Sequence, residues 1–551
     1  MLRDKAVQIE KGDGRLNILG INCFSHDTSA CLLKDGEVVA FAEEERFNRE
    51  KHTKSFPDGA IEFCLKAGGI DIGDVDYVGF PFRPGLDFYR GFLHFLKYFP
   101  GSYKRFALQG LIDLNLVGKV SYFKRKYGYK NKVVFVGHHE SHAASAFFAS
   151  PFSKAAILSI DRGGDFLSTL LAFGEGTGLR VLRTIPNPHS LGEVYSAVTA
   201  YLGFKPNSDE GKVMGLAPYG RDTYLEDFRK LIRFEESGAF EVDLDFFPHH
   251  LVGRWFSDKF VRKFGEPREP ESEIDARHED IAAAVQKITE ETALSLANDL
   301  YEMTKSKNLC IAGGVGLNSV MNARLLKETP FEEIFIQPAA NDAGTALGCA
   351  LYICHVLLGN ERNYRMEQVC YGPEFSNREI EEALRRRNIS FERLENPARR
   401  GAELLVKGKI VGWFQGKMEV GPRALGNRSI LADPRFPGMK DILNHKVKHR
   451  EGFRPFAPSV LEEDAEEYFG DYYPSPFMLL VLLFKKDKRS VVPAVTHVDG
   501  TGRVQTVSRK VNSLYWRLIA EFKKITGLPV ILNTSFNVRG QPIVRSPEDA
   551  L

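Results

Sequence analysis

The chain lacks the features of a membrane-spanning, secreted or zinc-finger protein. Its longest aliphatic run, residues 477–484, is far shorter than the roughly 20 apolar residues that span a bilayer, so we expect a strand there. Residues 1–16 are polar and have no apolar signal core, which predicts a poorly ordered leader and a cytoplasmic protein. The seven cysteines show no Cys-x-x-Cys spacing, which predicts reduced thiols in a core.

The chain also carries no large excess of positive or negative charge. The net charge is only +2, so composition gives no global argument for nucleic-acid binding. The sequence contains neither a P-loop nor a Gly-x-Gly-x-x-Gly fingerprint, so any nucleotide must be held in another way. A basic and aromatic segment at about 83–132 could bind RNA, but an amphipathic helical insertion with a solvated basic face is the favoured interpretation. At 551 residues the chain exceeds one compact core, and two to four domains are expected.

A histidine-rich helix stands at the centre of the sequence pattern. The apolar run 133–136 predicts a buried strand, and a helix is expected over 138–149. On that helix His138 and His142 lie four residues apart and share a face, which suits one first-row transition metal with carboxylates from elsewhere. His139, three residues before His142, is an alternative ligand. Ordinary polar surface is the other interpretation.

One strand pattern occurs twice. A strand, a polar turn, a strand, a second turn and a third strand begin near residue 16 and again near residue 155, which predicts a duplicated fold. The first polar turn carries His26 and Asp27, and the turn of the second copy carries Asp161 and Asp165. All four side chains could face a ligand. His26 has an alternative role as a turn residue that hydrogen-bonds its own backbone.

Glycine-rich and cationic loops follow several predicted strands. A strand at 309–311 leads into the glycines of 313–318, where backbone can approach a phosphate closely, and the next strand precedes Asp342. A composition shift near 358–374 predicts a domain boundary, and Asn377 is expected to cap a charged helix. Beyond it, cations and glycines share three loops, and such loops suit small phosphorylated substrates. These loops are 415–429, 446–456 and 533–540.

Taken together, these motifs resemble the NodU/CmcH/TobZ-type O-carbamoyltransferases. The matching stretches, in family order, are GINCFSHDTSACLLKDGEVVAFAEEERFNREKH, HHESHAASAF, DEGKVMGLAPYG, IAGGVGLNSVMNARL, GPRALGNRSILADPR, VKHREGFRPFAPSV and NTSFNVRGQPIV. The resemblance implies an α/β protein with an actin-like (ASKHA, TsaD-like) N-terminal domain over 17–360, including the insertion, and a YrdC-like C-terminal domain over 370–551. The family's C-terminal motif usually continues a little past residue 551, so a short tail helix is expected to be missing.

The resemblance also implies a reaction. Carbamoyl phosphate and ATP would give carbamoyladenylate in the C-terminal domain, and the carbamoyl group would then pass to a hydroxyl of a small-molecule acceptor in the N-terminal domain. Adenylation provides a good leaving group, and a neutral histidine can take the hydroxyl proton near pH 7. Two alternatives are a tRNA threonylcarbamoyl transferase and a non-catalytic actin-like nucleotide sensor. The acceptor and the oligomeric state stay open, and no membrane or nucleic-acid partner is expected.

Roles for single residues follow from their positions in the matching motifs. The resemblance implies His26 as general base and the adenylation residues Arg423, Lys448, Arg454, Arg503 and Ser535. It implies a divalent metal, iron(II), held by His138, His142, Asp161 and Asp342. Contacts with nucleotide or substrate are expected from Lys212, Gly313, Gly314, Gly316, Asn318, Asp165 and Asn533.

Overall fold

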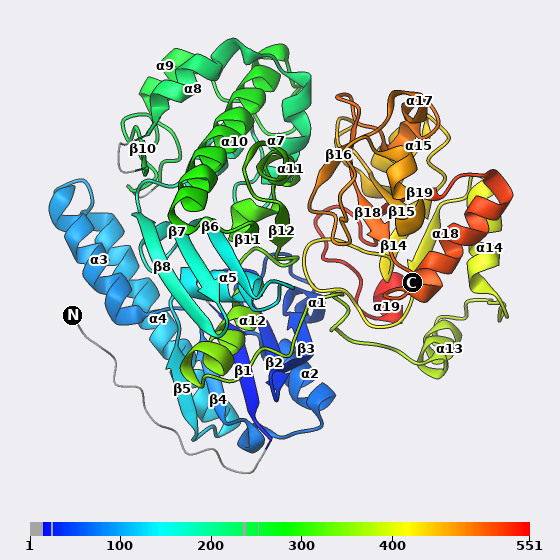
Figure 1. The fold of residues 1–551 in the computed structure, drawn as a ribbon, viewed down its shortest axis with the longest axis horizontal. Coiled ribbons are helices and arrows are strands. Elements are labelled where there is room, and N and C mark those ends of the chain that lie inside the picture. The colour runs from blue at the N-terminus through cyan, green and yellow to red at the C-terminus, as the bar shows by residue number, and fades with distance from the viewer. Residues whose placement is uncertain (1–14, 24–25, 235–237, 252) are drawn as a thin grey trace.

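Two five-stranded mixed sheets with the same topology build the N-terminal lobe (Figure 1). The computed structural model describes residues 15–23, 26–234, 238–251 and 253–551, so most of the predicted leader and part of the first polar turn lie outside the described residues. The strand orders are β3-β2-β1-β4-β5 and β8-β7-β6-β11-β12. In each sheet, three antiparallel strands are extended by two parallel ones, so the predicted duplication is confirmed.

The strand bounds of the two sheets are as follows. The first sheet contains β1 (Asn17–Asn22), β2 (Ser29–Lys34), β3 (Glu37–Glu43), β4 (Tyr77–Phe80) and β5 (Lys132–Phe135). The second contains β6 (Lys154–Gly164), β7 (Leu167–Glu175), β8 (Gly178–Pro186), β11 (Asn308–Ala312) and β12 (Glu333–Ile336).

Helices α5 (His138–Phe147) and α12 (Gly344–Leu351) pack against each other between the sheets. Gly348 permits this close approach, because a Cβ there would lie 1.8 Å from the backbone oxygen of Ser141. Gly20 of β1 likewise lets that strand approach α12, since a Cβ there would lie 1.9 Å from the Ala346 backbone oxygen. The packing fixes the beginnings of both helices, and these beginnings carry candidate site residues.

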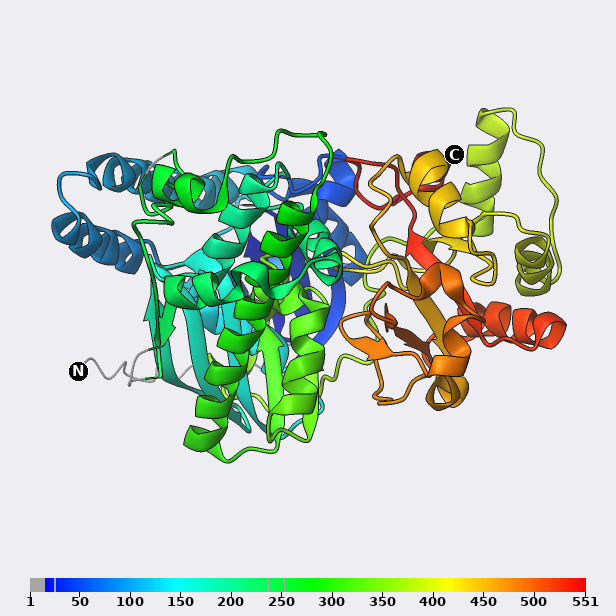
Figure 2. The ribbon, with the colours of Figure 1, turned by 90° about the horizontal axis from the view of Figure 1, so that it is seen from above.

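The outer helices cover the sheets, and one pair projects from the lobe. The long helix expected near 274–304 is α10 (Ala276–Thr304), and α3 (Pro84–Lys97) and α4 (Tyr103–Tyr127) form a hairpin on the side away from the C-terminal lobe (Figures 1 and 2). Among the described residues, no helix combines the length and the apolar composition that crossing a membrane requires. The remaining elements are α1 (Glu45–Asn48), α2 (Asp58–Gly68), α6 (Leu191–Tyr201), α7 (Glu210–Leu216), α8 (Leu225–Leu231), α9 (Asp258–Phe264), α11 (Ser319–Glu328), β9 (Ile232–Phe234) and β10 (Phe240–Val242).

The C-terminal lobe is built on one sheet of order β13-β14-β19-β15-β18. Helices α14 (Pro397–Val406) and α18 (Ser513–Thr526) pack together over its core. The sheet strands are β13 (Val411–Phe414), β14 (Arg428–Ala432), β15 (Ala457–Leu461), β18 (Gln505–Val507) and β19 (Val530–Ser535). The other elements are α13 (Asn377–Arg386), α15 (Met439–Ile442), α16 (Ala465–Tyr468), α17 (Lys486–Arg489), α19 (Pro547–Ala550), β16 (Val481–Leu483) and β17 (Thr501–Arg503).

Several local predictions are wrong. The apolar run at 133–136 supplies most of strand β5, as predicted, but this strand lies at the edge of its sheet and Phe135 is 39% exposed instead of buried. Most of the run 477–484 is not a strand: Met478 has a positive φ of 55°, and the following Leu479 and Leu480 pack into the core of the N-terminal lobe.

Two boundaries also move. Ser376, not Asn377, caps α13, since its side chain accepts a hydrogen bond from the Glu379 backbone N–H. Strand β6 runs on to Gly164, so Asp161 lies within the strand and the turn comes at Asp165. The cysteine prediction holds: all seven are free thiols and six are buried.

Candidate active site

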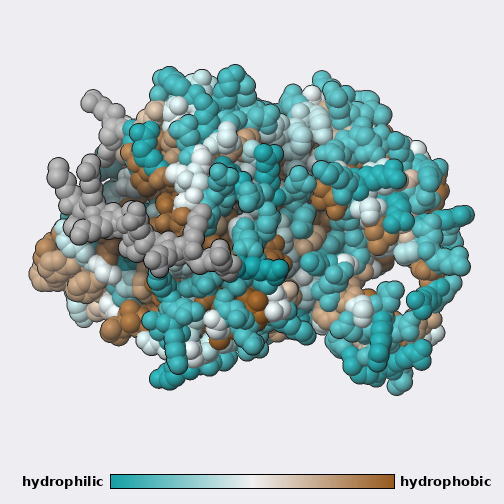
Figure 3. Space-filling view, turned by 60° about the horizontal axis from the view of Figure 1, so that its bottom comes forward, coloured by the Kyte–Doolittle hydropathy of each residue, from teal (hydrophilic) through white to brown (hydrophobic). Residues whose placement is uncertain are grey.

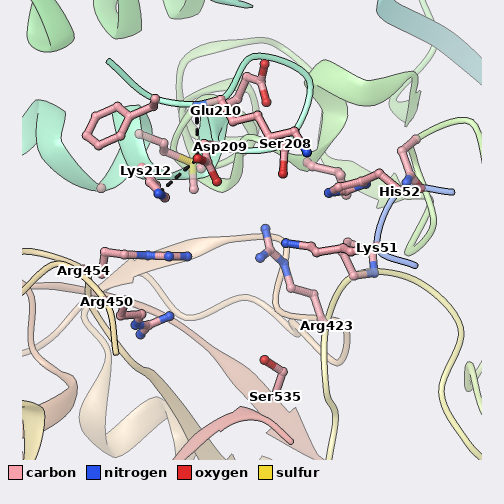
Figure 4. A pocket seen from close by; sticks show the side chains of 18 of the residues that line it. Lys51, His52, Ser208, Asp209, Glu210, Lys212, Arg423, Arg450, Arg454 and Ser535 are labelled. Atoms are coloured by element: carbon pink, nitrogen blue, oxygen red, sulfur yellow. Dashed lines mark hydrogen bonds and ion pairs between the residues drawn. The ribbon is translucent and has the colours of Figure 1, made fainter. Parts of the chain in front are cut away.

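A cavity of about 1360 Å³ lies between the lobes and collects side chains from both. Figure 4 shows Lys212 and Asp209 of the N-terminal lobe facing Arg454 and Arg450 of the C-terminal lobe, with Lys51 beside Arg423. Of the predicted site residues, those that line the cavity are His26, Asp161, Lys212, Gly314, Asn318, Arg423, Lys448, Arg454, Arg503, Asn533 and Ser535.

Two histidines of α5 meet two carboxylates beneath this cavity. The Nε2 atom of His138 lies 3.2 Å from Asp161 Oδ2 and 3.6 Å from Asp342 Oδ1, and that of His142 lies 3.5 and 3.8 Å from the same oxygens. Ligand atoms that share one metal at about 2.1 Å lie roughly 3.0–3.4 Å apart at octahedral or tetrahedral angles. The four residues are buried, and the geometry brings together the predicted set.

The electrostatics of this cluster demand a positive charge. Burial alone would lower the pKa of His142, but hydrogen bonds and the charges of Asp161 and Asp342 raise it to about 9. Burial opposes ionisation of Asp161 too, yet His138 and His142 hold the pKa of that carboxyl well below its usual range. Two buried carboxylates are costly without a cation, and a metal bound by neutral imidazoles meets that need as well as a proton does. The residues therefore fit a divalent transition metal.

His139 is not part of the cluster. Its Nδ1 lies 3.0 Å from Ser159 Oγ and its Nε2 lies 3.0 Å from the Leu167 backbone oxygen. Both ring nitrogens are thus engaged with β6 and β7, and burial lowers the pKa of His139 to about 3. Helical spacing left His138 and His139 as alternative partners of His142. The structure brings His138, and not His139, to the carboxylates.

His26 and His52 share one carboxylate at the cavity wall. His26 Nδ1 lies 3.0 Å from Asp27 Oδ2, and His52 Nδ1 lies 2.7 Å from Asp27 Oδ1. Burial acts to lower the pKa of His26, but the hydrogen bond to Asp27 and the charges of Asp342 and Asp27 raise it to about 9. A general base must be neutral, so the predicted role requires that some of this negative charge be balanced.

The glycine loop after β11 supports the cluster. The Gly314 N–H donates to Asp161 Oδ1 at 3.1 Å, which leaves Oδ2 to face the histidines. Gly313 has a φ of 85°, and a Cβ there would lie 2.2 Å from the Ile160 backbone oxygen. Gly313 and Gly316 do not line the cavity, and Asn318 Oδ1 caps α11 by accepting from the Met321 N–H.

Asp165 does not reach the cavity either. Its Oδ2 accepts from the His138 backbone N–H at 2.8 Å, and its Oδ1 accepts from the Arg83 backbone N–H at 2.9 Å. One carboxylate oxygen therefore caps the N-terminus of α5, and the other holds the segment that precedes α3. The residue is 3% exposed. The structure gives Asp165 a supporting position instead of the predicted ligand contact.

The C-terminal side of the cavity is crowded with cations. Burial and the neighbouring Arg454 lower the pKa of Arg423 to about 10, and burial together with three arginines holds the pKa of Arg503 well below its usual range. Within the described part of the chain, the buried Nε atoms of Arg423 and Arg503 have no hydrogen-bond partner. Such donors, held close together against their mutual repulsion, suit a polyanion.

Lys448 and Ser535 are joined in the same wall. Lys448 Nζ donates to the Ser535 backbone oxygen at 2.5 Å and to Asn537 Oδ1 at 2.8 Å, while Ser535 Oγ donates to Asn537 Oδ1 at 2.7 Å. Burial and the nearby Arg450, Arg454 and Lys51 hold the Lys448 pKa well below its usual range. Asn533 Nδ2 donates to the Ala424 backbone oxygen at 3.2 Å, so it braces the loop of Arg423.

Lys212 links the two lobes. Its Nζ lies 2.8 Å from Glu451 Oε1 and 3.0 Å from Asp209 Oδ2. Arg454 also lies 3.7 Å from Glu451, so one carboxylate serves cations from both lobes. Lys212 lines the cavity and is paired with carboxylates of both lobes, and its predicted contact with a nucleotide or substrate stays a prediction.

Sequence reasoning missed several cavity residues. His52, Lys51, Arg162 and Arg450 all line the cavity, and none was assigned a role. The charged run that contains Lys51 and the basic loop that contains Arg450 were both visible. When several charged residues follow one another, however, the sequence does not show which of their side chains points into a cavity.

A duplicated mixed-sheet lobe, a buried cluster of two histidines and two carboxylates, and a cation-lined cavity define an α/β protein built to handle anionic substrates. The model described as Carbamoyltransferase N-terminus matches residues 17–351, and that described as Carbamoyltransferase C-terminus matches 402–551. The chain therefore belongs to the carbamoyltransferase family, and it is an enzyme of that class.

The chain is also similar to curated proteins over nearly its whole length. An uncharacterized protein of Synechocystis is 43% identical over 97% of this chain and 93% of its own length. Nodulation protein NolNO of Sinorhizobium fredii is 41% identical over 96% of this chain and 77% of its own. The crystal structure of HypF from T. kodakarensis covers 64% of this chain and 49% of its own at 12% identity and a TM-score of 0.33, a likeness too small to support an argument.

Proposed function

We propose that this carbamoyltransferase is ATP-dependent and works in two half-reactions at the two ends of one cavity. In the first, water hydrolyses carbamoyl phosphate to carbamate and inorganic phosphate, and a carbamate oxygen then attacks the α-phosphorus of ATP, which gives carbamoyladenylate and releases pyrophosphate. In the second, an acceptor hydroxyl attacks the carbamoyl carbon, AMP leaves, and the hydroxyl proton passes to a base. The acceptor is a small hydroxylated molecule, such as a sugar or a natural product.

The cation cluster of the C-terminal lobe carries this proposal. ATP and carbamoyl phosphate both carry several negative charges. The buried donors of Arg423 and Arg503 can form charge-assisted hydrogen bonds with their phosphate oxygens. Arg454, Lys448 and Ser535 complete the proposed adenylation site. Because these groups already depress one another's pKa, a bound polyanion relieves repulsion that exists without it.

The proposed transfer site lies at the other end of the cavity. His26 lines the cavity as the proposed base, and Asp27 holds its ring through Nδ1. His138, His142, Asp161 and Asp342 would hold a divalent metal, which we propose to be iron(II). When bound, such a metal supplies positive charge beside the leaving phosphate and offsets the carboxylate charge that raises the pKa of His26.

We also propose a fold class for each lobe and a boundary between them. We assign the N-terminal lobe to the actin-like class because both of its sheets repeat one five-stranded topology around two central helices. We propose a YrdC-like origin for the C-terminal lobe and a domain boundary between residues 360 and 370.

The direct test is release of pyrophosphate from ATP with and without carbamoyl phosphate, followed by detection of a carbamoylated product with candidate hydroxylated acceptors. The proposal predicts pyrophosphate only when both substrates are present. A nucleotide sensor predicts none, and a tRNA-modifying enzyme predicts transfer to RNA instead of to small hydroxylated acceptors.

A further inference from the structure

The α3–α4 hairpin presents a large apolar surface that the proposed reaction does not use. Of the 29 large apolar side chains exposed among the described residues, 12 fall between Phe88 and Val117, so they are concentrated on this hairpin and not scattered singly over the molecule. These residues are Phe88, Tyr89, Phe92, Leu93, Leu96, Phe99, Tyr103, Leu108, Leu111, Ile112, Leu114 and Val117. Figure 3 shows brown, hydrophobic residues at the end of the molecule from which the hairpin projects.

The insertion is helical, as the sequence predicted, but its apolar part was not expected. Lys124 and Arg125 near the end of α4 are exposed, as a solvated basic face requires, whereas the exposed side chains between 88 and 117 are largely apolar. Two other cations of α4 contact the body of the lobe. Lys119 donates to the Cys23 backbone oxygen at 2.8 Å, and Lys126 lies 2.8 Å from an Asp58 carboxylate oxygen.

Contacts with the N-terminal lobe and between its own two helices hold the hairpin in place. Arg90 donates to the Asp165 backbone oxygen at 2.7 Å, and the ring of His94 lies 5.6 Å from that of Phe166. Between the two helices, the ring of Phe106 packs 5.1 Å from that of Phe95 and 5.6 Å from that of Phe88. The exposed apolar residues are therefore held outward by a fixed scaffold.

Among the described side chains of 84–117, the exposed charged ones are cationic. Lys97 and Lys104 flank the turn of the hairpin and are exposed. Asp113 is buried and accepts a hydrogen bond from Gln109, so among the described side chains of 84–117 no carboxylate is exposed. Aromatic and aliphatic side chains flanked by lysines match the interface of an anionic bilayer, where rings sit at headgroup level and cations meet lipid phosphates.

We propose that the α3–α4 hairpin docks this protein on the surface of an anionic lipid bilayer, with its apolar face in the interface and Lys97 and Lys104 at the lipid phosphates. A second copy of the chain suits the surface less well. A two-fold interface sets the same patch against itself, so the two lysines would meet a surface without exposed carboxylates among its described side chains. The inference does not depend on the reaction proposed above.

Flotation of the purified full-length protein with vesicles tests this proposal. The wild type is expected to float with vesicles that contain phosphatidylglycerol and to float poorly with phosphatidylcholine alone. The double variants Leu96→Asp with Phe99→Asp, and Lys97→Glu with Lys104→Glu, should each lower the vesicle partition coefficient at least tenfold. The control Val498→Asp, which changes an exposed apolar residue of the C-terminal lobe, should float like the wild type.

Two results would overturn the proposal. One is a wild type that fails to float with anionic vesicles. The other is flotation of both double variants at the wild-type level. If light scattering instead shows a dimer that Leu96→Asp with Phe99→Asp splits, the patch is an interface between copies and the lipid proposal is wrong. Because the lysine pair is exposed, its reversal tests the idea even if the apolar variant misfolds. Vesicle binding is measured without substrates, so it is independent of the proposed reaction.

Discussion

The two ends of the interlobe cavity differ in their balance of charge. Beneath the N-terminal wall, the imidazoles of His138 and His142 face the carboxylates of Asp161 and Asp342, so opposite charges compensate one another. At the C-terminal wall, the cations outnumber the carboxylates that face them, and Glu451 is shared between Lys212 and Arg454. The first arrangement is complete with one small cation, whereas the second needs a polyanion. On this difference rests our proposal that transfer occurs at one end and activation at the other.

The sharpest way to break this comparison is to disable one end only. The change His26→Asn keeps much of the size of the side chain but removes its proton acceptor. General-base assistance is worth roughly 10²–10⁴-fold. We therefore expect transfer to an acceptor to slow by about that factor while pyrophosphate release stays near normal. Measuring both products in the same reactions would reveal the separation.

An equal fall in both rates, in a variant with normal thermal stability, would mean that His26 is not specific to transfer. If His26 only stabilises its turn, its replacement should lower both rates equally or lower the stability modestly without separating the two rates.

The reciprocal experiment disables the cationic end. Arg423→Ala or Arg503→Ala removes a charged donor, which is worth about 1.5–3 kcal/mol, or roughly 10–100-fold. We expect carbamoyl-phosphate-dependent pyrophosphate release to fall by at least that factor, while transfer from ready-made carbamoyladenylate persists. Arg399→Ala is the matched control, because Arg399 is exposed on α14 and pairs with Glu403. Normal pyrophosphate release by both cavity variants would place adenylation elsewhere.

Adjacent histidines offer a matched test of the other end. His138→Gln should lower metal content by about an order of magnitude or more, because it removes a ligand. His139→Gln should keep the metal, since the ring of His139 is engaged with Ser159 and Leu167. Elemental analysis of both purified variants decides the matter. Full metal in His138→Gln would refute the ligand set.

The smallest expected effect is a shift in pH dependence. A base acts in its neutral form, so the transfer rate should rise as pH climbs through the pKa of His26, which the structure places at about 9 when the carboxylate charges are unbalanced. Asp27→Asn removes a hydrogen bond and a charge that raise this pKa. The midpoint of the transfer profile should therefore move down by about one pH unit or more. An unmoved midpoint would show that another group titrates.

The sequence predicted the repeated sheets because each repeat is a short-range pattern of strands and turns. Helical spacing alone puts His138 and His142 on one face, whereas Asp161 and Asp342 were added to the predicted ligand set by the family resemblance. Sequence-based prediction failed where placement depends on distant packing: nothing local shows that β5 lies at a sheet edge or that Leu479 enters the core of the other lobe. The pairing of His26 and His52 through Asp27 was hidden for the same reason, because Asp27 and His52 are 25 residues apart.

The most direct test of the central claim is the release of pyrophosphate from ATP by the wild-type protein as carbamoyl phosphate is titrated in. If the cationic wall is the site of adenylation, pyrophosphate should appear only with carbamoyl phosphate, rise to saturation with it, and disappear in Arg503→Ala. Pyrophosphate release that ignores carbamoyl phosphate, or that Arg503→Ala leaves intact, would contradict the division of labour between the two ends of the cavity.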